Sequence, residues 1–268
     1  MTYAQRLATV TADRGRLCIG IDPMPGVLDA WGCPRSVDGL ERVARGIVET
    51  LGSRIAVFKP QSAFFEAYGS RGVAVLERVL IDIHAAGALS ILDVKRGDIG
   101  SSMQGYADAF LGDEAPLRAD AITVSPYLGV GALRPAIEAA VAGGQGVYVL
   151  ARTSNPDGAP VQLARTGSAT VAQHVVDEAR ALNATHDGAV GLVVGATHAD
   201  TGCDLDGFNG SILVPGIGAQ GGTVESLRGV FGGAVAHVLP TASREVIGKG
   251  AAELVARADR LLASVSVL

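Results

Sequence analysis

The sequence has few aromatic residues and few cysteines, and both shortages limit what the protein can be. Aromatic residues make up 4% of the 268 residues and hydrophobic residues 48%, so the core must be built mainly from Ala, Val, Leu and Ile. Such a composition, with 36 glycines, is typical of an α/β protein with buried parallel strands. The three cysteines and five histidines are scattered, so neither a disulfide framework nor a metal site is expected.

The sequence also lacks an apolar run of membrane-spanning length and a cluster of basic residues. The N-terminal stretch "MTYAQRLATVTADRGR" has no apolar core of signal-peptide length. The net charge is −5, and no block of Lys and Arg stands out. We therefore expect a cytoplasmic protein that binds neither a membrane nor a nucleic acid. A small anionic substrate is still compatible, because local charge can oppose the net charge.

Short apolar runs rich in β-branched residues recur along the chain and are separated by amphipathic stretches of helical period. Strands are predicted at residues 17–21, 55–58, 89–92, 121–124, 146–150, 190–194, 211–214 and 235–239. Helices are clearest over residues 37–51 and 72–87, and an Ala-rich stretch of helical period covers residues 243–265. This alternation predicts a (β/α)8 TIM barrel, with a doubly wound sheet as the alternative. We expect residues 1–268 to form a single domain, with a short N-terminal helix over residues 3–13 that closes the bottom of the barrel.

Charged residues follow two of the predicted strands, at the end where a TIM barrel carries its chemistry. In "ILDVKRGDIGSS", Asp93 and Lys95 should share one face of a strand and point into the barrel mouth, whereas Asp98 can point elsewhere. Lys59 ends the preceding strand, so we expect Lys59, Asp93 and Lys95 to lie together. The alternative is an exposed ion pair on a loop, which contributes about 0–1 kcal/mol. An alternating array of cation, anion and cation is costly to build for packing alone, and this favours a functional site.

A glycine-rich stretch, "ILVPGIGAQGG", has the glycine spacing of a dinucleotide-binding loop at Gly216, Gly218 and Gly221. A dinucleotide loop should follow the first strand, with an acidic residue at the end of the next one. Here the loop follows the seventh predicted strand, and Arg244 precedes any acid after the eighth. Backbone N–H groups in such a turn favour phosphate in either setting, so we interpret Gly218 and Gly221 as part of a phosphate loop.

With these motifs in place, the chain resembles the orotidine 5′-phosphate decarboxylase family from the first strand to the last, and in particular its actinobacterial branch. The matching motifs are "IGIDP", "FKP", "LDVKRGDIGSS", "TVSPYLG", "PGIGAQGG" and "ASREV", and "ARTSNP" is similar to the actinobacterial pattern. One departure is Ser102, where the family usually carries Thr; both residues supply a hydroxyl. The resemblance implies decarboxylation of orotidine 5′-monophosphate (OMP) to UMP and CO2, the last step of de novo UMP biosynthesis, without a cofactor or metal.

The resemblance also implies roles for individual residues. Lys95 would stabilise the carbanion at C6 of the pyrimidine and protonate it, Asp93 would hold Lys95 near the substrate carboxylate, and Lys59 would flank Asp93. The remaining expectations are Asp22 for the ribose hydroxyls, Ser125 for the pyrimidine amide edge, Gln220 and Arg244 for the 5′-phosphate, and Asp98, Ile99 and Ser102 supplied by the second subunit of a homodimer.

Several alternatives remain open at this stage. Ser125 can be a turn residue before a proline, and Arg244 an exposed helix residue. Related sugar-phosphate decarboxylases and aldolases use Mg²⁺ with a Glu at the end of the second strand; Lys59 stands there instead, and an ammonium group repels a divalent cation. A phosphate-binding barrel without catalytic activity would need the glycine loop but not the charged array. The side chains of Arg152, Thr153 and Asn155 in "ARTSNP" can border the pocket or only shape a loop.

Overall fold

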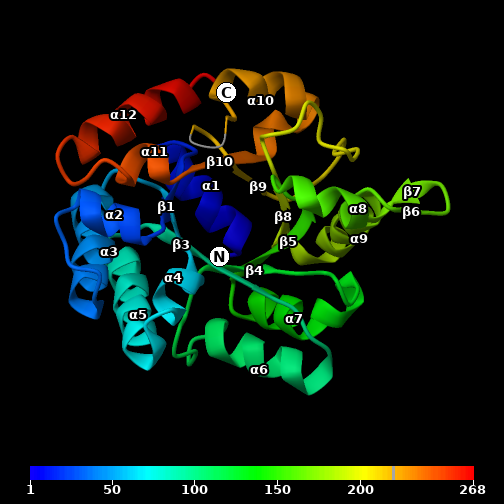
Figure 1. The fold of residues 1–268 in the computed structure, drawn as a ribbon. Helices are drawn as coiled ribbons and strands as arrows, with labels where there is room; N and C mark the ends of the chain where they lie inside the picture. The colour runs from blue at the N-terminus through cyan, green and yellow to red at the C-terminus, as the bar shows by residue number, and fades with distance from the viewer. Residues whose placement is uncertain (219–220) are drawn as a thin grey trace.

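A computed structural model of the chain describes residues 1–218 and 221–268. In these residues, eight parallel strands close into a barrel in the order β1-β10-β9-β8-β5-β4-β3-β2 (Figure 1). The barrel strands are β1 (Cys18–Ile21), β2 (Val57–Pro60), β3 (Leu89–Arg96), β4 (Ala121–Val124), β5 (Gly146–Arg152), β8 (Val190–Val194), β9 (Ile212–Pro215) and β10 (Val238–Ala242). The predicted TIM barrel is therefore confirmed.

Helices surround this barrel (Figure 1). They are α1 (Tyr3–Arg14), α2 (Pro25–Ala30), α3 (Val37–Leu51), α4 (Ser62–Glu66), α5 (Gly69–Ala85), α6 (Gly100–Phe110), α7 (Arg134–Ala142), α8 (Ala159–Gln162), α9 (Val171–His186), α10 (Val224–Phe231), α11 (Arg244–Ile247) and α12 (Leu254–Val265). Short 3-10 turns cover Val130–Leu133, Pro156–Gly158 and Gly232–His237. A hairpin of β6 (Arg165–Thr166) and β7 (Ala169–Thr170) extends away from the barrel.

The bounds of four predicted strands were wrong by two to four residues: β2 and β10 begin and end later than expected, and β3 and β5 end later than expected. The strand expected at 55–58 is β2, and the strand expected at 235–239 is β10. In the parallel barrel Lys59 pairs with Gly20, and Thr241 pairs with Cys18. Pairing with neighbouring strands thus carries both strands beyond their apolar runs, so Lys59 and Thr241 are held as strand residues at the barrel mouth.

The single helix suggested over residues 243–265 was also wrong, because the structure divides it into α11 and α12. Gly250 lies in the break with φ +80°, and a Cβ atom there would come within 2.4 Å of the Ala30 carbonyl oxygen. A residue with a side chain would be strained in this backbone conformation and would clash. The break therefore depends on glycine and on close contact with the end of α2.

The N-terminal helix α1 closes the amino-terminal end of the barrel. Tyr3 is buried in a cluster with the strand residues Val57 and Ile91. Its hydroxyl lies 3.0 Å from the hydroxyl of Tyr148, and the two rings meet edge to face. With this end filled, the open end of the barrel is the one formed by the carboxyl ends of the strands.

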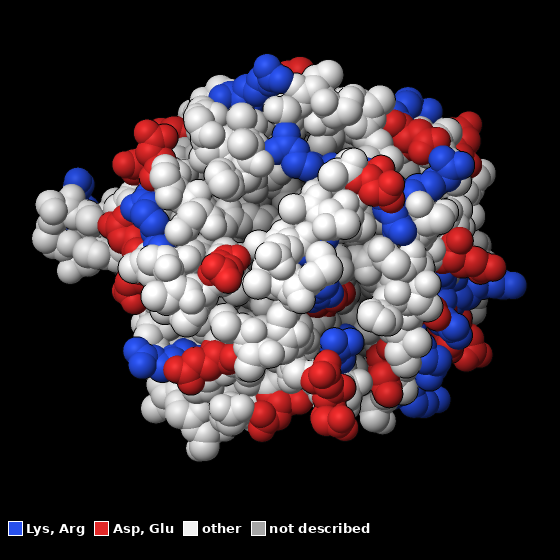
Figure 2. Space-filling view, turned by 180° about the vertical axis from the view of Figure 1, so that it is seen from behind, with Lys and Arg blue, Asp and Glu red and all other residues white. Residues whose placement is uncertain are grey.

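The surface carries charges of both signs. Figure 2 shows Lys and Arg interspersed with Asp and Glu on one face of the molecule, so this face of the described chain has no broad basic surface of the kind that binds nucleic acid. Within residues 1–218 and 221–268, no helix combines the length and the apolar character needed to cross a membrane.

Candidate active site

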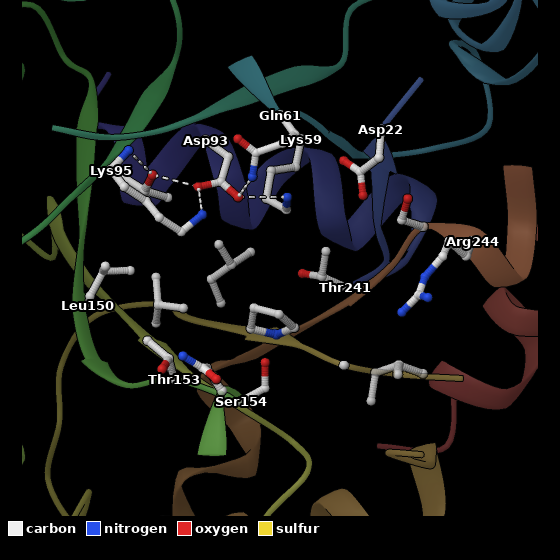
Figure 3. A pocket seen from close by; sticks show the side chains of 18 of the residues that line it. Asp22, Lys59, Gln61, Asp93, Lys95, Leu150, Thr153, Ser154, Thr241 and Arg244 are labelled. Atoms are coloured by element: carbon white, nitrogen blue, oxygen red, sulfur yellow. Dashed lines mark hydrogen bonds and ion pairs between the residues drawn. The ribbon is translucent and has the colours of Figure 1, made fainter. Parts of the chain in front are cut away.

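A cavity of about 500 Å³ lies at the carboxyl ends of the barrel strands (Figure 3). Its lining comes from many strands and the loops that follow them: Asp22, Lys59, Gln61, Asp93, Lys95, Thr123, Leu150, Thr153, Ser154, Asn155, Gln162, Val193, Leu213, Pro215, Gly216, Ile217, Thr241, Ser243 and Arg244. Catalytic residues of TIM barrels occupy this end, so the cavity is the candidate active site.

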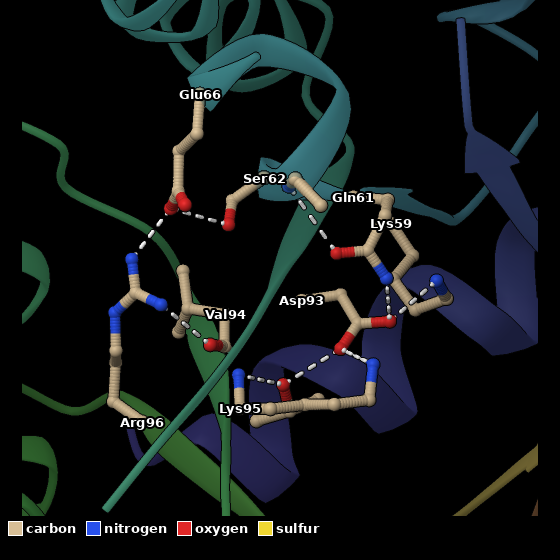
Figure 4. A network of polar contacts seen from close by, with 10 residues as sticks. Lys59, Gln61, Ser62, Glu66, Asp93, Val94, Lys95 and Arg96 are labelled. Carbon is tan, nitrogen blue, oxygen red and sulfur yellow. Dashed lines mark hydrogen bonds and ion pairs between the residues drawn. The ribbon is translucent and has the colours of Figure 1, made fainter. Parts of the chain in front are cut away.

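The carboxylate of Asp93 accepts hydrogen bonds from four side chains (Figure 4). Its Oδ2 atom accepts from Lys59 Nζ at 3.0 Å and from Gln61 Nε2 at 2.9 Å. Its Oδ1 atom accepts from Lys95 Nζ at 2.6 Å and from Thr123 Oγ1 at 2.8 Å. The structure thus brings Lys59, Asp93 and Lys95 together, and it adds Gln61 and Thr123 to them.

Opposite charges keep the buried part of this array ionised. Burial by itself raises the pKa of Asp93, but the ammonium groups of Lys59 and Lys95 outweigh it and hold the pKa below its ordinary value. Burial by itself lowers the pKa of Lys59, but the carboxylates of Asp93 and Asp22 outweigh it and raise the pKa above its ordinary value. Asp93 and Lys59 are therefore both charged near neutral pH.

Lys95 differs from Lys59 in exposure and in backbone conformation. The Lys95 side chain is 46% exposed and that of Lys59 is 8% exposed, so Lys95 is the more accessible of the two lysines that line the cavity. The backbone of Lys95 has φ +45°, which costs a residue with a side chain about 1–3 kcal/mol. Its N–H group donates to Thr123 Oγ1 at 2.9 Å. Asp93 and Lys95 were expected on one face because alternate residues of a regular strand share a face. The two side chains do meet, but β3 is irregular at this point, and the irregularity turns Lys95 toward Asp93.

Two polar atoms at the other end of the cavity lack partners. Within the described part of the chain, the buried atoms Asp22 Oδ1 and Ser243 Oγ have no hydrogen-bond partner. Leaving such an atom unpaired costs about 1–3 kcal/mol, so this end is suited to hydroxyl groups of a ligand. Arg244 lies beside them, across the cavity from Lys95 (Figure 3).

The glycine-rich loop contributes Gly216 and Ile217 to the cavity lining. Gly218 and Gly221 have φ +76° and +92°, and their N–H groups donate within the loop, to Gly222 O and Gly218 O respectively. Gln220, expected to bind phosphate, lies outside the described residues.

Six of the expected site residues that the structure describes do not line the cavity of this chain: Asp98, Ile99, Ser102, Ser125, Gly218 and Gly221. Ile99 is 62% exposed, Ser102 is exposed on α6, and the Asp98 carboxylate accepts from the Ile99 N–H at 2.8 Å. Ser125 lies just beyond β4, and its N–H donates to the Arg96 carbonyl.

The stretch after β5 lines the cavity at Thr153 and Ser154, across from Asp93 (Figure 3). Thr153 N donates to Gln162 Oε1 at 3.1 Å, and Ser154 O accepts from Thr197 Oγ1 at 3.0 Å. Among the described residues, the N–H and the hydroxyl of Ser154 have no hydrogen-bond partner. A hydrogen-bonded segment therefore carries a residue with a free backbone donor and a free hydroxyl at the cavity.

Comparison with known proteins assigns the chain to a family. The sequence model described as the orotidine 5′-phosphate decarboxylase / HUMPS family matches residues 15–258. The chain belongs to this family. The match covers the barrel from the first strand to α12, so every candidate residue named above lies within it.

Relatives with the same name are similar over nearly their whole length. An orotidine 5′-phosphate decarboxylase of Salinispora arenicola is 57% identical over 267 residues, covering 98% of this chain and 96% of the relative. One from Streptomyces coelicolor is 50% identical over 255 residues, covering 92% of this chain and 90% of the relative. A crystal structure from Streptomyces avermitilis, assigned to the same enzyme, has a TM-score of 0.95 and 51% identity, covering 99% of this chain and 95% of that one. These matches confirm the family resemblance and its actinobacterial character.

Sequence reasoning missed cavity residues that the family motifs did not emphasise. Gln61 stands two residues after Lys59, a spacing that places both on one face of an extended chain. Thr123 is a polar residue inside the apolar run of β4. Both signals were present in the sequence, whereas the free groups of Ser154 depend on contacts from distant segments.

Replacing Thr123 by Val should lower the free energy of unfolding by about 1–3 kcal/mol, because it removes one donor from the buried Asp93 carboxylate and leaves the part-buried Lys95 N–H unpaired. Urea unfolding measures the change. Thr241→Val is the matched control, since Thr241 is also a buried strand residue but its hydroxyl donates to a neutral carbonyl, Leu239 O at 3.3 Å, rather than to a buried carboxylate. A valine at position 123 that stabilises the protein would contradict this role.

Proposed function

We propose that this chain is an orotidine 5′-phosphate decarboxylase, which converts OMP to UMP and CO2 in pyrimidine biosynthesis. The observation that carries the proposal is the Lys59–Asp93–Lys95 array at the open end of a barrel that belongs to this family. Fold alone would not decide the activity, because one barrel supports many reactions.

Lys95 has the position of the group that acts on the reacting carbon. Loss of CO2 breaks the bond between C6 and the carboxyl carbon and leaves the electron pair on C6, in the plane of the ring. The pair cannot spread into the π system, so the protein must stabilise it by fixed charge. The Lys95 ammonium group supplies that charge and then transfers a proton to C6, which gives UMP and a neutral amine that regains its proton from solvent.

Asp93 and Lys59 support Lys95. The bond of 2.6 Å from Lys95 Nζ to Asp93 Oδ1 fixes the ammonium group in the cavity. Lys59, buried on the other carboxylate oxygen, keeps Asp93 ionised and points toward the ribose end. An Mg²⁺ ion at Asp93 would have to displace this ammonium group, so the array fits the decarboxylase better than the metal-dependent branch of the family.

The far end of the cavity suits a ribose phosphate. Asp22 and Ser243 offer unpaired buried oxygens to the ribose hydroxyls. Arg244 supplies a planar guanidinium group, which binds phosphate oxygens with paired, charge-assisted bonds. Gln220 remains a predicted phosphate ligand, whereas the N–H groups of Gly218 and Gly221 already donate within the loop, so these two glycines shape the loop that carries Gln220.

The pyrimidine amide edge is better matched by Ser154 than by Ser125. That edge presents a carbonyl acceptor beside an N–H donor. Ser154 lines the cavity, and its free N–H and hydroxyl supply a donor and an acceptor for such an edge. Ser125 lies outside the cavity lining, so we assign the base edge to Ser154.

The second subunit of a homodimer would complete the site. Asp98, Ile99 and Ser102 do not line the cavity of their own chain. Ile99 is 62% exposed, and Tyr127, in the loop after β4, is 81% exposed. Exposed apolar side chains of this size favour a protein contact.

We assign the reaction to the cytoplasm, because the three cysteines of the described chain are free thiols.

Purified protein should convert OMP to UMP in the presence of EDTA, because the charge that stabilises C6 comes from lysine rather than from a metal. The UV absorbance of the pyrimidine ring follows the reaction, and chromatography identifies UMP. Absence of UMP would refute the decarboxylase; loss of activity with EDTA would favour the metal-dependent branch.

Ser154→Ala should raise KM for OMP by roughly tenfold, as expected when one hydrogen bond to the base is lost. Ser125→Ala should change KM by less than about twofold, since its side chain lies outside the cavity. Steady-state kinetics of both variants separates the two assignments. A larger effect at Ser125 would restore the assignment made from the sequence.

Lys95→Ala and Asp98→Ala should each be inactive alone, and their mixture should recover about a quarter of the wild-type activity. Random exchange makes half of the dimers mixed, and each mixed dimer has one intact site if Asp98 acts across the interface. Activity is measured after the two variants are unfolded and refolded together. No recovery, with dimers present by size-exclusion chromatography, would place Asp98 outside the partner's site.

A further inference from the structure

The phosphate end of the cavity depends on a helix that is too short to hold its own position. α11 has four residues, and Arg244 is the first of them. A helix of one turn is unstable alone, because nucleation fixes several dihedral angles for a single hydrogen bond. Contacts from elsewhere in the chain must therefore determine where the Arg244 guanidinium group points.

Two side chains from distant elements bind the last carbonyl groups of α11. Arg257 Nε, from α12, donates to Val246 O at 2.6 Å. Trp31 Nε1, at the end of α2, donates to Ile247 O at 2.9 Å. Carbonyl groups in a last helical turn have no partner within the helix, so these two bonds satisfy them and tie α11 to both neighbours.

Arg257 also fixes the turn that follows α11. It is buried, and its Nη1 and Nη2 atoms donate to the carbonyl groups of Ala252 and Gly250. Its hydrogen-bond partners among the described residues are backbone carbonyls rather than carboxylates. One guanidinium group on α12 thus holds one carbonyl of α11 and two carbonyls of the segment between α11 and α12.

We propose that Arg257 and Trp31 are positioning residues that aim Arg244 at the phosphate of the substrate. The proposal rests on the function proposed above, which makes the 5′-phosphate the ligand of Arg244. Neither residue is among the described residues that line the cavity, so both act through α11. A small displacement of a binding group is costly in affinity and rate, and here it would affect only ligands that carry the phosphate.

The test compares OMP with orotidine, the nucleoside that lacks the phosphate. Arg257→Met removes the donors and keeps the apolar stem; it should lower kcat/KM for OMP about tenfold to a hundredfold and leave orotidine within about twofold. Trp31→Phe removes one N–H group and should lower kcat/KM for OMP about threefold, again without affecting orotidine. Arg260→Met, at an exposed position of α12, is the matched control and should match the wild type with both substrates. Equal losses with OMP and orotidine, or no loss with OMP, would overturn the proposal.

Calorimetric titration with UMP and uridine makes the same comparison without turnover. If the wild type binds UMP but does not decarboxylate OMP, the proposed function fails, and loss of UMP affinity in Arg257→Met still supports the positioning role. If Arg257→Met does not fold, as judged by thermal unfolding, Trp31→Phe decides. Weaker UMP binding with unchanged uridine binding supports the proposal, and unchanged UMP binding overturns it.

Discussion

The site depends on one buried carboxylate that is fully hydrogen-bonded. An isolated charge at the position of Asp93 would be strongly unfavourable, and removing one partner from a buried ion pair leaves an uncompensated charge. The four donors to Asp93 come from β2 and the residue after it, from β3, and from β4. The pairing of three neighbouring strands is therefore what makes the ionised carboxylate tolerable, and the carboxylate in turn fixes Lys95.

Lys59 and Lys95 bind the same carboxylate but are not equivalent. Lys59 continues a regular strand and is buried, whereas Lys95 leaves the extended conformation at φ +45° and is half-exposed. β3 ends one residue later, at Arg96, and Asp98 and the exposed Ile99 follow in the loop beyond it. The irregularity in β3 thus accompanies the contact between the Lys95 ammonium group and Asp93, and Asp98 follows after the strand has ended.

Most of the fold could be predicted from the sequence, and the errors have a common physical origin. The helix expected over residues 37–51 is α3 in the structure, because a strong amphipathic period lies between a capping Ser36 and Gly52. Strand ends were less certain, since pairing across the barrel extends β2 to Lys59 and Pro60. The charged array followed from motif and position, but the choice between Ser125 and Ser154 requires knowing which segment reaches the cavity, and no local pattern contains that information.

The division between α11 and α12 shows how tertiary contact overrides a correct local pattern. Helical period is present on both sides of Gly248 and Gly250, and a glycine inside a helix costs only about 1 kcal/mol, so the pattern favours one continuous helix. The contact between Gly250 and the Ala30 carbonyl, together with the bonds from Arg257, stabilises a turn instead. Because of that turn, α12 can pack against α3 while α11 keeps a separate direction. Arg244, the first residue of α11, can then face the cavity. If α11 were a rigid extension of α12, the direction of α12 would decide where Arg244 points.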